Sequence, residues 1–212
     1  MAYRTTPKMA ARKQERRQAI LAVATRLFGR HGYHATTVPM IVAEAGTSTG
    51  NFYFYFRNKE DIFAAALAGL AERISAATGA AAAKAPAAPL AQMKAAVEGF
   101  VLFLAQNPGE ARILIVESSG LSPRLEQIRR SVMASHACGV EKVLRRLAPK
   151  LPLSDSAIMA RCWTGAVYEA VYSWLELPAK KRPPAKVLAG AVARFNLRAV
   201  GAPVTLTEQR CV

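Results

Sequence analysis

The chain has 212 residues, of which 52% are hydrophobic, and its formal net charge is +15 at pH 7. That length allows one large domain, or a small domain joined to a larger one. No apolar run approaches the roughly 18 residues of a membrane span, the N-terminus lacks the apolar core of a secretory signal, and Cys138, Cys162 and Cys211 form no disulfide framework or CxxC pair. We therefore expect a protein of the reducing cytoplasm, without a membrane partner.

The first helix is predicted from a run of apolar residues at helical spacing. Its apolar face consists of Ile20, Val23, Ala24, Leu27 and Phe28. Gly29 and Gly32 are expected to end this helix, because glycine accepts the left-handed conformation of a helix C-terminus.

Two short helices should follow. Thr36 or Thr37 is a suitable N-cap for the second helix, which has Pro39 in its first turn and Gly46 at its end. Ser48 is a suitable N-cap for a third helix of about two turns, ending near Phe56.

The rest of the chain also has helical patterns and no alternating strand pattern, so we predict an all-α fold. Asn58 should cap a long fourth helix that begins at Lys59. After Ala76 the sequence becomes alanine-rich with two prolines, which indicates either a helix end followed by a loop or a short linker. Further helices are expected over residues 90–106, 110–118, 123–147, 155–177 (capped by Ser154 or Asp155) and 184–200.

Positive charge concentrates at the N-terminal end. Residues 1–60 contain ten Lys or Arg and three acidic residues, Glu15, Glu44 and Glu60. Such a region binds nucleic acid, a membrane surface or an acidic protein, or it is a solvated tail that keeps the chain soluble. Charge alone leaves these alternatives open.

The two short helices narrow the choice, because a helix, a glycine-containing turn and a second helix are the arrangement of a helix-turn-helix motif. The second helix of this motif, which is the third helix of the chain, starts at the small polar run Thr47–Asn51 and continues into five aromatic residues. Phe52 and Phe56 are four residues apart and should point inward, while Tyr53 and Phe54 should point outward. DNA would cover the outward rings; the alternative is an aromatic corner of the core.

Residues 17–68 resemble the DNA-binding domain of the TetR family of transcriptional regulators. The resemblance rests on ILAVATRLFGRHGYHATTV and AEAGTSTGNFYFYFRNKEDIFAAAL, and on a third-helix pattern met at Ser48, Gly50, Phe52, Tyr53, Tyr55, Phe56, Lys59, Glu60 and Ile62. It implies a homodimer that binds a near-palindromic double-stranded DNA operator. It also implies a C-terminal domain that binds a small lipophilic ligand and responds to it. The residues that it assigns to DNA binding are Thr37, Ser48, Thr49, Gly50, Asn51, Tyr53, Phe54, Tyr55 and Lys59.

We expect a division into a mobile basic arm (1–15), a helix-turn-helix domain (16–58), a helical ligand-binding and dimerisation domain (59–202) and a tail (203–212). Two apolar stripes, one around Ile158, Cys162 and Trp174 and one around Val187 and Phe195, either belong to the core or pair with their copies in a dimer.

The ligand pocket is expected among helices four to eight. The candidate lining residues are Phe63, Leu67, Phe100, Phe103, Leu104, Arg112, Ile113, Val116, Glu117, Met133, His136, Ala137, Val140, Trp163, Val167 and Tyr168. Residues 113–130 resemble the corresponding stretch of TetR relatives that respond to acyl-CoAs or to aromatic, flavonoid-like compounds. That resemblance makes a repressor released by such a ligand the main hypothesis.

No enzyme motif is found. His31 and His34 are three residues apart but have no carboxylate or cysteine beside them, so we expect no metal site, no cofactor and no catalytic activity. Two other classes remain open: a DNA-binding architectural protein without a ligand, and a basic membrane-surface protein.

Overall fold

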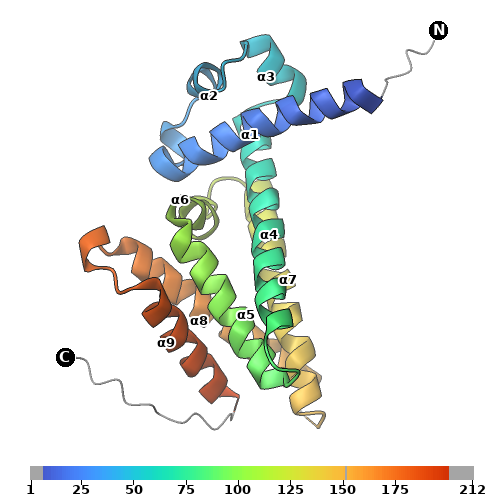
Figure 1. The fold of residues 1–212 in the computed structure, drawn as a ribbon, viewed down its shortest axis with the longest axis vertical. Coiled ribbons are helices and arrows are strands. Elements are labelled where there is room, and N and C mark those ends of the chain that lie inside the picture. The colour runs from blue at the N-terminus through green and yellow to red at the C-terminus, as the bar shows by residue number, and fades with distance from the viewer. Residues whose placement is uncertain (1–6, 151, 201–212) are drawn as a thin grey trace. The chain divides into compact units, whose positions relative to one another are not determined.

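The computed structural model describes residues 7–150 and 152–200, and within these ranges it consists of helices without a strand (Figure 1). The all-α prediction is therefore confirmed. The α-helices are α1 (Pro7–Ala35), α2 (Val38–Glu44), α3 (Thr49–Tyr55), α4 (Lys59–Lys84), α5 (Pro89–Gln106), α6 (Pro108–Arg112), α7 (Pro123–Leu147), α8 (Leu153–Glu176) and α9 (Ala185–Ala199). A π-helical turn, Ile113–Glu117, follows α6, and a 3₁₀ turn, Ala179–Lys181, precedes α9.

The helices pack into two compact units. The first unit runs to Ala71 and includes Pro108–Arg129, whereas the second consists of Glu72–Asn107 and the chain from Arg130 onward. The functional division that the sequence places at Lys59 stays a prediction, and these packing units divide the chain elsewhere. Of the expected N-terminal arm, residues 7–15 form the first turns of α1; residues 1–6 and the expected tail lie outside the described residues.

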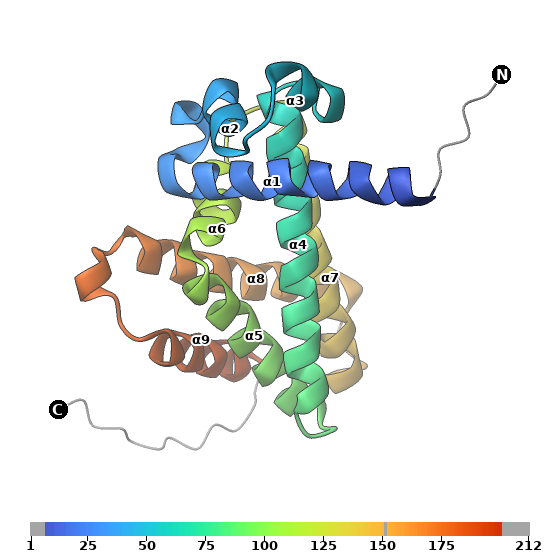
Figure 2. The same cartoon turned by 45° about the horizontal axis from the view of Figure 1, so that its top comes forward.

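The first unit is built around α1, with α2 and α3 lying on the same side of it (Figure 2). The inward face of α1 is the predicted one, since Ile20, Leu27 and Phe28 are almost completely buried. Phe28 packs edge-on against Phe63 of α4, with ring centroids 4.9 Å apart. Burial of each large apolar side chain contributes about 1.5–3 kcal/mol, so this cluster holds the short helices in place.

The second unit packs α5 against α8 and α9 (Figure 1). Val101 and Leu104 of α5, Val171 of α8 and Ala193 of α9 are fully or almost fully buried. The small Ala193 side chain allows close approach of α9, and the larger residues fill the space between the helices.

Helix α4 is longer than the sequence indicated. It continues through the alanine-rich segment to Lys84, because alanine has the highest helix propensity and outweighs Gly79 within the segment. By length and composition alone, α4 is also apolar enough to cross a membrane. Core helices pass the same test, and Ile62, Leu67 and Leu70 of α4 are completely buried in the protein.

The expected cap of α8 is wrong. The helix begins at Leu153, directly after Pro152, and has no side-chain cap at that position. The Ser154 hydroxyl instead donates to the Asp155 carboxylate over 3.0 Å, while the hydroxyl of buried Ser156 donates to the Leu153 carbonyl over 2.9 Å. Proline fixes its own φ at a value that suits a helix start, and the helix begins two residues before the predicted start.

Candidate functional site

Side-chain caps fix the turn between α2 and α3. The Thr37 hydroxyl accepts a hydrogen bond from the backbone N–H of Met40 over 3.4 Å, and the Ser48 hydroxyl accepts one from the N–H of Asn51 over 3.1 Å. Gly46 lies between the two helices with φ +56°, a conformation that L side chains rarely adopt. The predicted caps and the predicted glycine turn are confirmed, and they set the direction of α3.

The aromatic run of α3 divides into two faces, as predicted. Phe52 and Phe56 are completely buried, whereas Tyr53 and Phe54 are 52% and 64% exposed. The buried pair anchors α3 to the unit, so the outward rings are held on a fixed surface.

The N-terminal half of α3 is polar and sterically open. The Asn51 side-chain amide donates to the Thr47 hydroxyl over 2.6 Å, one turn earlier. Nothing lies within 4 Å of a Cβ placed on Gly50. An amide has two N–H groups and a carbonyl oxygen, so Asn51 keeps groups for a further partner.

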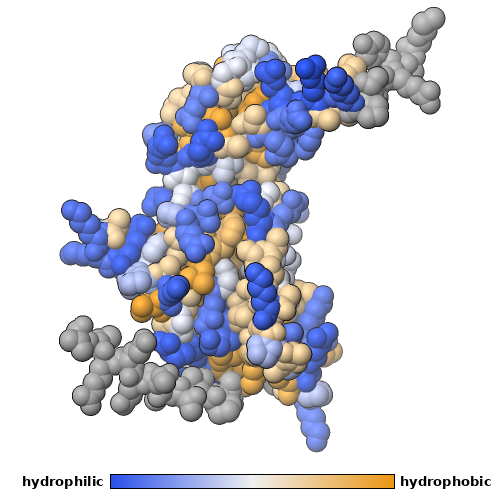
Figure 3. Space-filling view, viewed as in Figure 1, coloured by the Kyte–Doolittle hydropathy of each residue, from blue (hydrophilic) through white to orange (hydrophobic). Residues whose placement is uncertain are grey.

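The basic start of α1 lies beside this surface. The Lys13 ammonium is 4.7 Å from the ring centroid of exposed Phe54, and the Arg17 guanidinium is 4.9 Å from that of Phe56. Lys8, Arg12 and Arg16 are exposed on the same helix, and Figure 3 shows hydrophilic side chains crowded along the N-terminal part of α1. Together α1 and α3 present cations interleaved with aromatic rings.

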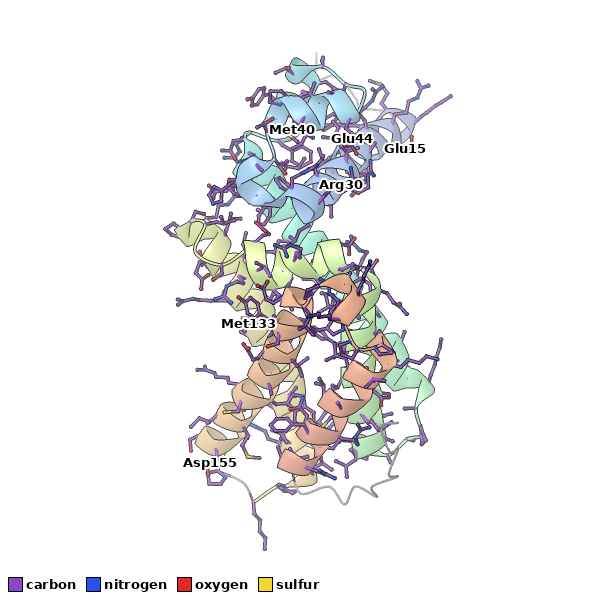
Figure 4. The ribbon with its side chains drawn as sticks, turned by 90° about the vertical axis from the view of Figure 1, so that its left-hand side faces the viewer. Glu15, Arg30, Met40, Glu44, Met133 and Asp155 are labelled. Carbon is purple, nitrogen blue, oxygen red and sulfur yellow. The ribbon has the colours of Figure 1, made fainter. Side chains whose placement is uncertain are left out.

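Ion pairs and helix-end contacts tie the short helices together. The Arg26 guanidinium lies 3.2 Å from the carboxylate of Glu44, which Figure 4 labels on α2. The Lys59 ammonium donates to the carbonyls of Tyr33 and His34 over 2.9 and 3.3 Å, and it lies 4.4 Å from the centre of the Tyr33 ring. Burial lowers the pKa of Lys59, while burial, followed by the charge of Glu60, raises the pKa of Tyr33.

The segment 108–129 packs against the C-terminal end of α1, and we name this contact the α1 joint. A Cβ on Gly29 would lie 2.8 Å from the backbone carbonyl of Gly109. One turn later Gly32 has φ +81°, and the Glu117 carboxylate accepts a hydrogen bond from the N–H of Tyr33 over 2.9 Å. The joint therefore requires backbone-to-backbone contact at Gly29 and a carboxylate at Glu117.

The same segment also holds the start of α4. Ser122 donates to Glu60 over 3.1 Å, and the Arg124 guanidinium donates to the Asp61 carboxylate over 2.9 Å. That hydrogen bond is the main reason why the pKa of Asp61 is lowered. Residues 108–129 are thus part of the framework that positions the helix-turn-helix motif.

The second unit contains a cavity of about 390 Å³. Its lining comes from α4, α5, α7 and α8 and includes no Asp, Glu, Lys or Arg. The residues that line it are Ser75, Thr78, Gly79, Ala82, Gln92, Met93, Ala96, Val97, Phe100, Ser135, His136, Gly139, Val140, Val143, Trp163, Thr164, Val167 and Tyr168. A mostly apolar cavity with a few polar groups is typical of small-molecule sites.

A histidine–tyrosine pair is the main polar feature of the cavity. His136 Nδ1 and the Tyr168 hydroxyl share a hydrogen bond of 2.9 Å, and the tautomer of the ring decides which atom donates. The Phe100 ring packs edge-on against His136, with centroids 5.3 Å apart. Burial lowers the pKa of His136, so the ring is neutral near pH 7.

An apolar face of α8 and α9 stays open. Ile158 and Phe195 are 60% and 63% exposed, and Val187 and Tyr172 are also exposed. Figure 3 shows hydrophobic side chains on the surface over these helices. Trp163, Val171 and Leu175 of the predicted α8 stripe are instead buried, so each stripe contains a core face and an open face.

Comparison with known proteins identifies the family of the first unit. The sequence model described as "Bacterial regulatory proteins, tetR family" matches residues 20–66. These residues carry the sequence pattern of the TetR-family DNA-binding domain. The helix-turn-helix segment is 47% identical over 58 residues to the HTH-type transcriptional regulator HbdR of Aromatoleum sp. (strain CIB), covering 27% of this chain and 24% of HbdR. It is 48% identical over 44 residues to the HTH-type transcriptional regulator QacR of Staphylococcus aureus, covering 21% and 23%.

The aligned segments thus span about a quarter of these two regulators, 24% and 23% of their lengths. Solved structures extend the likeness of fold to most of the chain. A bacterial regulatory protein in the TetR family from Rhodococcus RHA1 superposes with a TM-score of 0.72 at 24% identity, covering 90% of this chain and 99% of that one. The regulator FadR of Bacillus subtilis, solved in complex with stearoyl-CoA, gives a TM-score of 0.73 at 18% identity, covering 86% and 98%.

The structure brings the predicted DNA-binding residues together in the first unit. Thr37 and Ser48 cap α2 and α3, and Thr49–Tyr55 is α3 itself. Lys59 begins α4, but its ammonium is bonded to the end of α1.

The predicted ligand residues do not all gather at the cavity. Six of them line it: Phe100, His136, Val140, Trp163, Val167 and Tyr168. Four others belong to the second unit but are absent from the lining: Phe103, Leu104, Met133 and Ala137. Figure 4 labels Met133. The others lie in the first unit, and they are Phe63, Leu67, Arg112, Ile113, Val116 and Glu117.

Sequence reasoning assigned the wrong turns of α4 to the cavity, those of Phe63 and Leu67 instead of the later part of the helix. Ser75, Thr78 and Ala82 line the cavity from the part of α4 that was expected to end or to become a linker. Thr78 gives the clearest missed signal, because a hydroxyl within an alanine-rich helix stands out. Its Oγ1 is buried and has no hydrogen-bond partner.

Proposed function

We propose that this TetR-family protein is a DNA-binding transcriptional repressor of the cytoplasm, without enzymatic activity, that a lipophilic small molecule releases from its operator. The observation that carries the proposal is the surface of α3, where exposed Tyr53 and Phe54 follow a capped, polar helix start. A recognition helix of this kind enters the major groove with its N-terminal residues at the base edges.

The charge and chemistry of that surface support DNA as the partner. Lys8, Arg12, Lys13 and Arg16 lie exposed on α1, whose Lys13 contacts the exposed Phe54 ring. Cations attract phosphates, hydroxyls such as that of Tyr53 donate to phosphate oxygens, and rings contact the thymine methyl group. An aromatic corner of the core does not account for rings that remain exposed.

The open face of α8 and α9 supports a homodimer. Large exposed apolar patches mark interaction sites, and a two-fold interface buries the same patch on both copies. A dimer would present two α3 helices to two half-sites of a near-palindromic operator. The Phe195→Glu variant should shift the protein from dimer to monomer in sedimentation, with Lys142→Glu, a charge reversal at an exposed residue of α7, as the control. A Phe195→Glu protein that stays dimeric would contradict this interface.

The cavity of the second unit supports a ligand-responsive function. The stearoyl-CoA in the FadR structure supports the general class of lipophilic effectors. The chain also gives a route for coupling, because α4 and α7 each belong in part to both units and only Asn107 separates α5 from α6. A ligand that favours the state with lower DNA affinity shifts the population toward that state.

The experiment that tests the function is footprinting of the purified protein on DNA that flanks its own gene, repeated with a panel of lipophilic compounds. We expect protection of a near-palindromic site and loss of protection with at least one compound. Coupling of about 1–3 kcal/mol corresponds to a roughly 5–150-fold fall in operator affinity. Protection that no compound relieves would favour a ligand-independent architectural protein, and binding without sequence preference would contradict the proposal.

A further inference from the structure

We propose that the cavity of the second unit takes a compact, uncharged aromatic compound with a hydroxyl or carbonyl group, and not an acyl-CoA or a fatty acid. This inference rests on the proposed ligand-responsive function and assigns the chemical class of the ligand. It follows from the charge, the shape and the hydrogen-bonding groups of the lining.

The absence of charge from the lining argues against an anionic ligand. Of the residues that line the cavity, none is Asp, Glu, Lys or Arg. A carboxylate or phosphate that leaves water without a cationic partner loses its hydration with no compensating ion pair. A fatty acid carries one such group and an acyl-CoA carries several, so an enclosed position in this cavity is unfavourable for both.

The size and the walls of the cavity favour flat rings. Its volume of about 390 Å³ lies near the lower limit of the roughly 300–1,000 Å³ that is typical of ligand pockets. Phe100 and Tyr168 form one wall, with centroids 5.6 Å apart and planes tilted by 41°, and Trp163 is a third aromatic residue of the lining. Aromatic walls interact with a ligand ring through stacked or edge-on contacts, in addition to the hydrophobic contribution of burial.

The His136–Tyr168 pair supplies the hydrogen bond that a phenol or ketone needs. Nδ1 of the imidazole is engaged with the Tyr168 hydroxyl, and Nε2 makes no hydrogen bond to the described residues. In a neutral ring one nitrogen donates and the other accepts, so the tautomer of His136 adapts to a ligand carbonyl or to a ligand hydroxyl. The low pKa that burial gives to His136 favours this neutral form.

A second polar position lies on α4. The Thr78 hydroxyl is buried without a hydrogen-bond partner, and Thr78 lines the cavity. Thr78 thus offers another group to an uncharged ligand that has two polar ends, at a point where neither a cation nor a carboxylate is available.

The test compares ligands of matched shape. Isothermal titration calorimetry at pH 7.5 would measure the affinity of biphenyl-4-ol, of its charged analogue biphenyl-4-carboxylate and of stearoyl-CoA, together with a panel of neutral phenols and aryl ketones of one to three rings. We expect at least one neutral aromatic compound to bind, and biphenyl-4-ol to bind more tightly than the carboxylate. Tighter binding of stearoyl-CoA or of the carboxylate, or no binding by any neutral aromatic compound, would overturn the assignment.

Two variants place the binding in the cavity. Tyr168→Phe and His136→Gln should each weaken the best neutral ligand by about fivefold, the loss expected for one hydrogen bond. Ser154→Ala removes an exposed hydroxyl near the start of the same helix and should leave the affinity unchanged. The Trp174→Phe protein keeps Trp163 as its single tryptophan, so quenching of its fluorescence would report a ligand at the cavity wall. Unchanged affinity in both polar variants, or no quenching, would contradict this position.

The outcome for the ligand class is distinct from the outcome for the proposed function. Release of the operator by stearoyl-CoA, with no binding of neutral aromatics, would leave the repressor proposal intact and overturn the ligand class. A neutral aromatic compound that binds in the cavity but does not change operator affinity would support the class and contradict the ligand-responsive repressor.

Discussion

The helix-turn-helix region and the cavity differ in how their residues are brought together. Around α3 the controlling contacts are local: Thr37, Ser48 and Asn58 each accept a hydrogen bond from a backbone N–H three residues later. The cavity collects residues from α4, α5, α7 and α8, which are far apart in the chain. Local contacts reveal themselves in a short stretch of sequence, whereas a cavity depends on the register and packing of several long helices.

The α1 joint breaks this contrast, because it is a long-range contact within the helix-turn-helix unit. Gly29→Ala would place a Cβ 2.8 Å from the Gly109 carbonyl, where only backbone could move away. We expect it to lower the free energy of unfolding by about 1–3 kcal/mol, as overpacking does. Urea unfolding followed by circular dichroism measures the change.

Gly50→Ala is the matched control, since nothing lies within 4 Å of a Cβ at that helical position. It should be neutral or stabilising by up to about 1 kcal/mol, because alanine favours helix. Equal stability changes in the two variants would show that the joint is not tightly packed.

The sequence predicted the local part of the fold well for a physical reason. The helix caps, the Gly46 turn and the inward pair Phe52 and Phe56 depend on neighbours within four residues. The residue types in a short stretch of sequence are therefore enough to predict their structural roles. Glu117 shows the opposite case. It was interpreted as a ligand residue from its place in an apolar stretch, but its carboxylate caps the Tyr33 N–H, 84 positions away in the sequence.

The cavity was predicted only in part, because the apolar periodicity of a helix shows which face is buried but not which other helices pack against that face. Phe63 and Leu67 have the correct apolar pattern for a pocket, yet they are completely buried in the core of the first unit. Only the later turns of α4 reach the cavity, through Ser75, Thr78 and Ala82. The point at which α4 passes from one unit to the other is set by packing, and no residue type marks it.

Base readout tests whether the local chemistry of α3 has the expected function. The Asn51 amide uses one N–H for Thr47, which leaves one N–H for adenine N7 and the carbonyl oxygen for N6. Asn51→Ala should lower discrimination at one symmetric position per half-site by roughly 1–3 kcal/mol. Selection of binding sites from random DNA by both proteins measures this, and an identical consensus would exclude Asn51 from readout.

The phosphate contact expected of Tyr53 should have a smaller and less selective effect. Its side chain is 52% exposed beside the buried Phe52 ring. Tyr53→Phe removes one hydroxyl and should weaken operator and non-specific DNA alike by about 1 kcal/mol at fixed salt. Fluorescence anisotropy on both DNAs gives the two affinities. A loss confined to the operator would assign Tyr53 to base recognition, and no loss would remove it from the interface.

The smallest expected effect concerns the second unit, where His136 couples the cavity to pH. Burial lowers the folded-state pKa of His136, while in the unfolded chain the pKa has its ordinary value of about 6.5. The neutral ring therefore stabilises the fold fully above about pH 6.5, and this contribution is lost as pH falls through the folded pKa.

The free energy of unfolding of the unmodified protein should decrease more between pH 7 and pH 5 than that of His136→Gln. Carboxylates such as Asp61 are common to both proteins and cancel in the difference, and Tyr172→Phe, which removes no imidazole, should follow the unmodified protein. Parallel pH profiles for the unmodified protein and His136→Gln would mean that the cavity does not lower the pKa of His136.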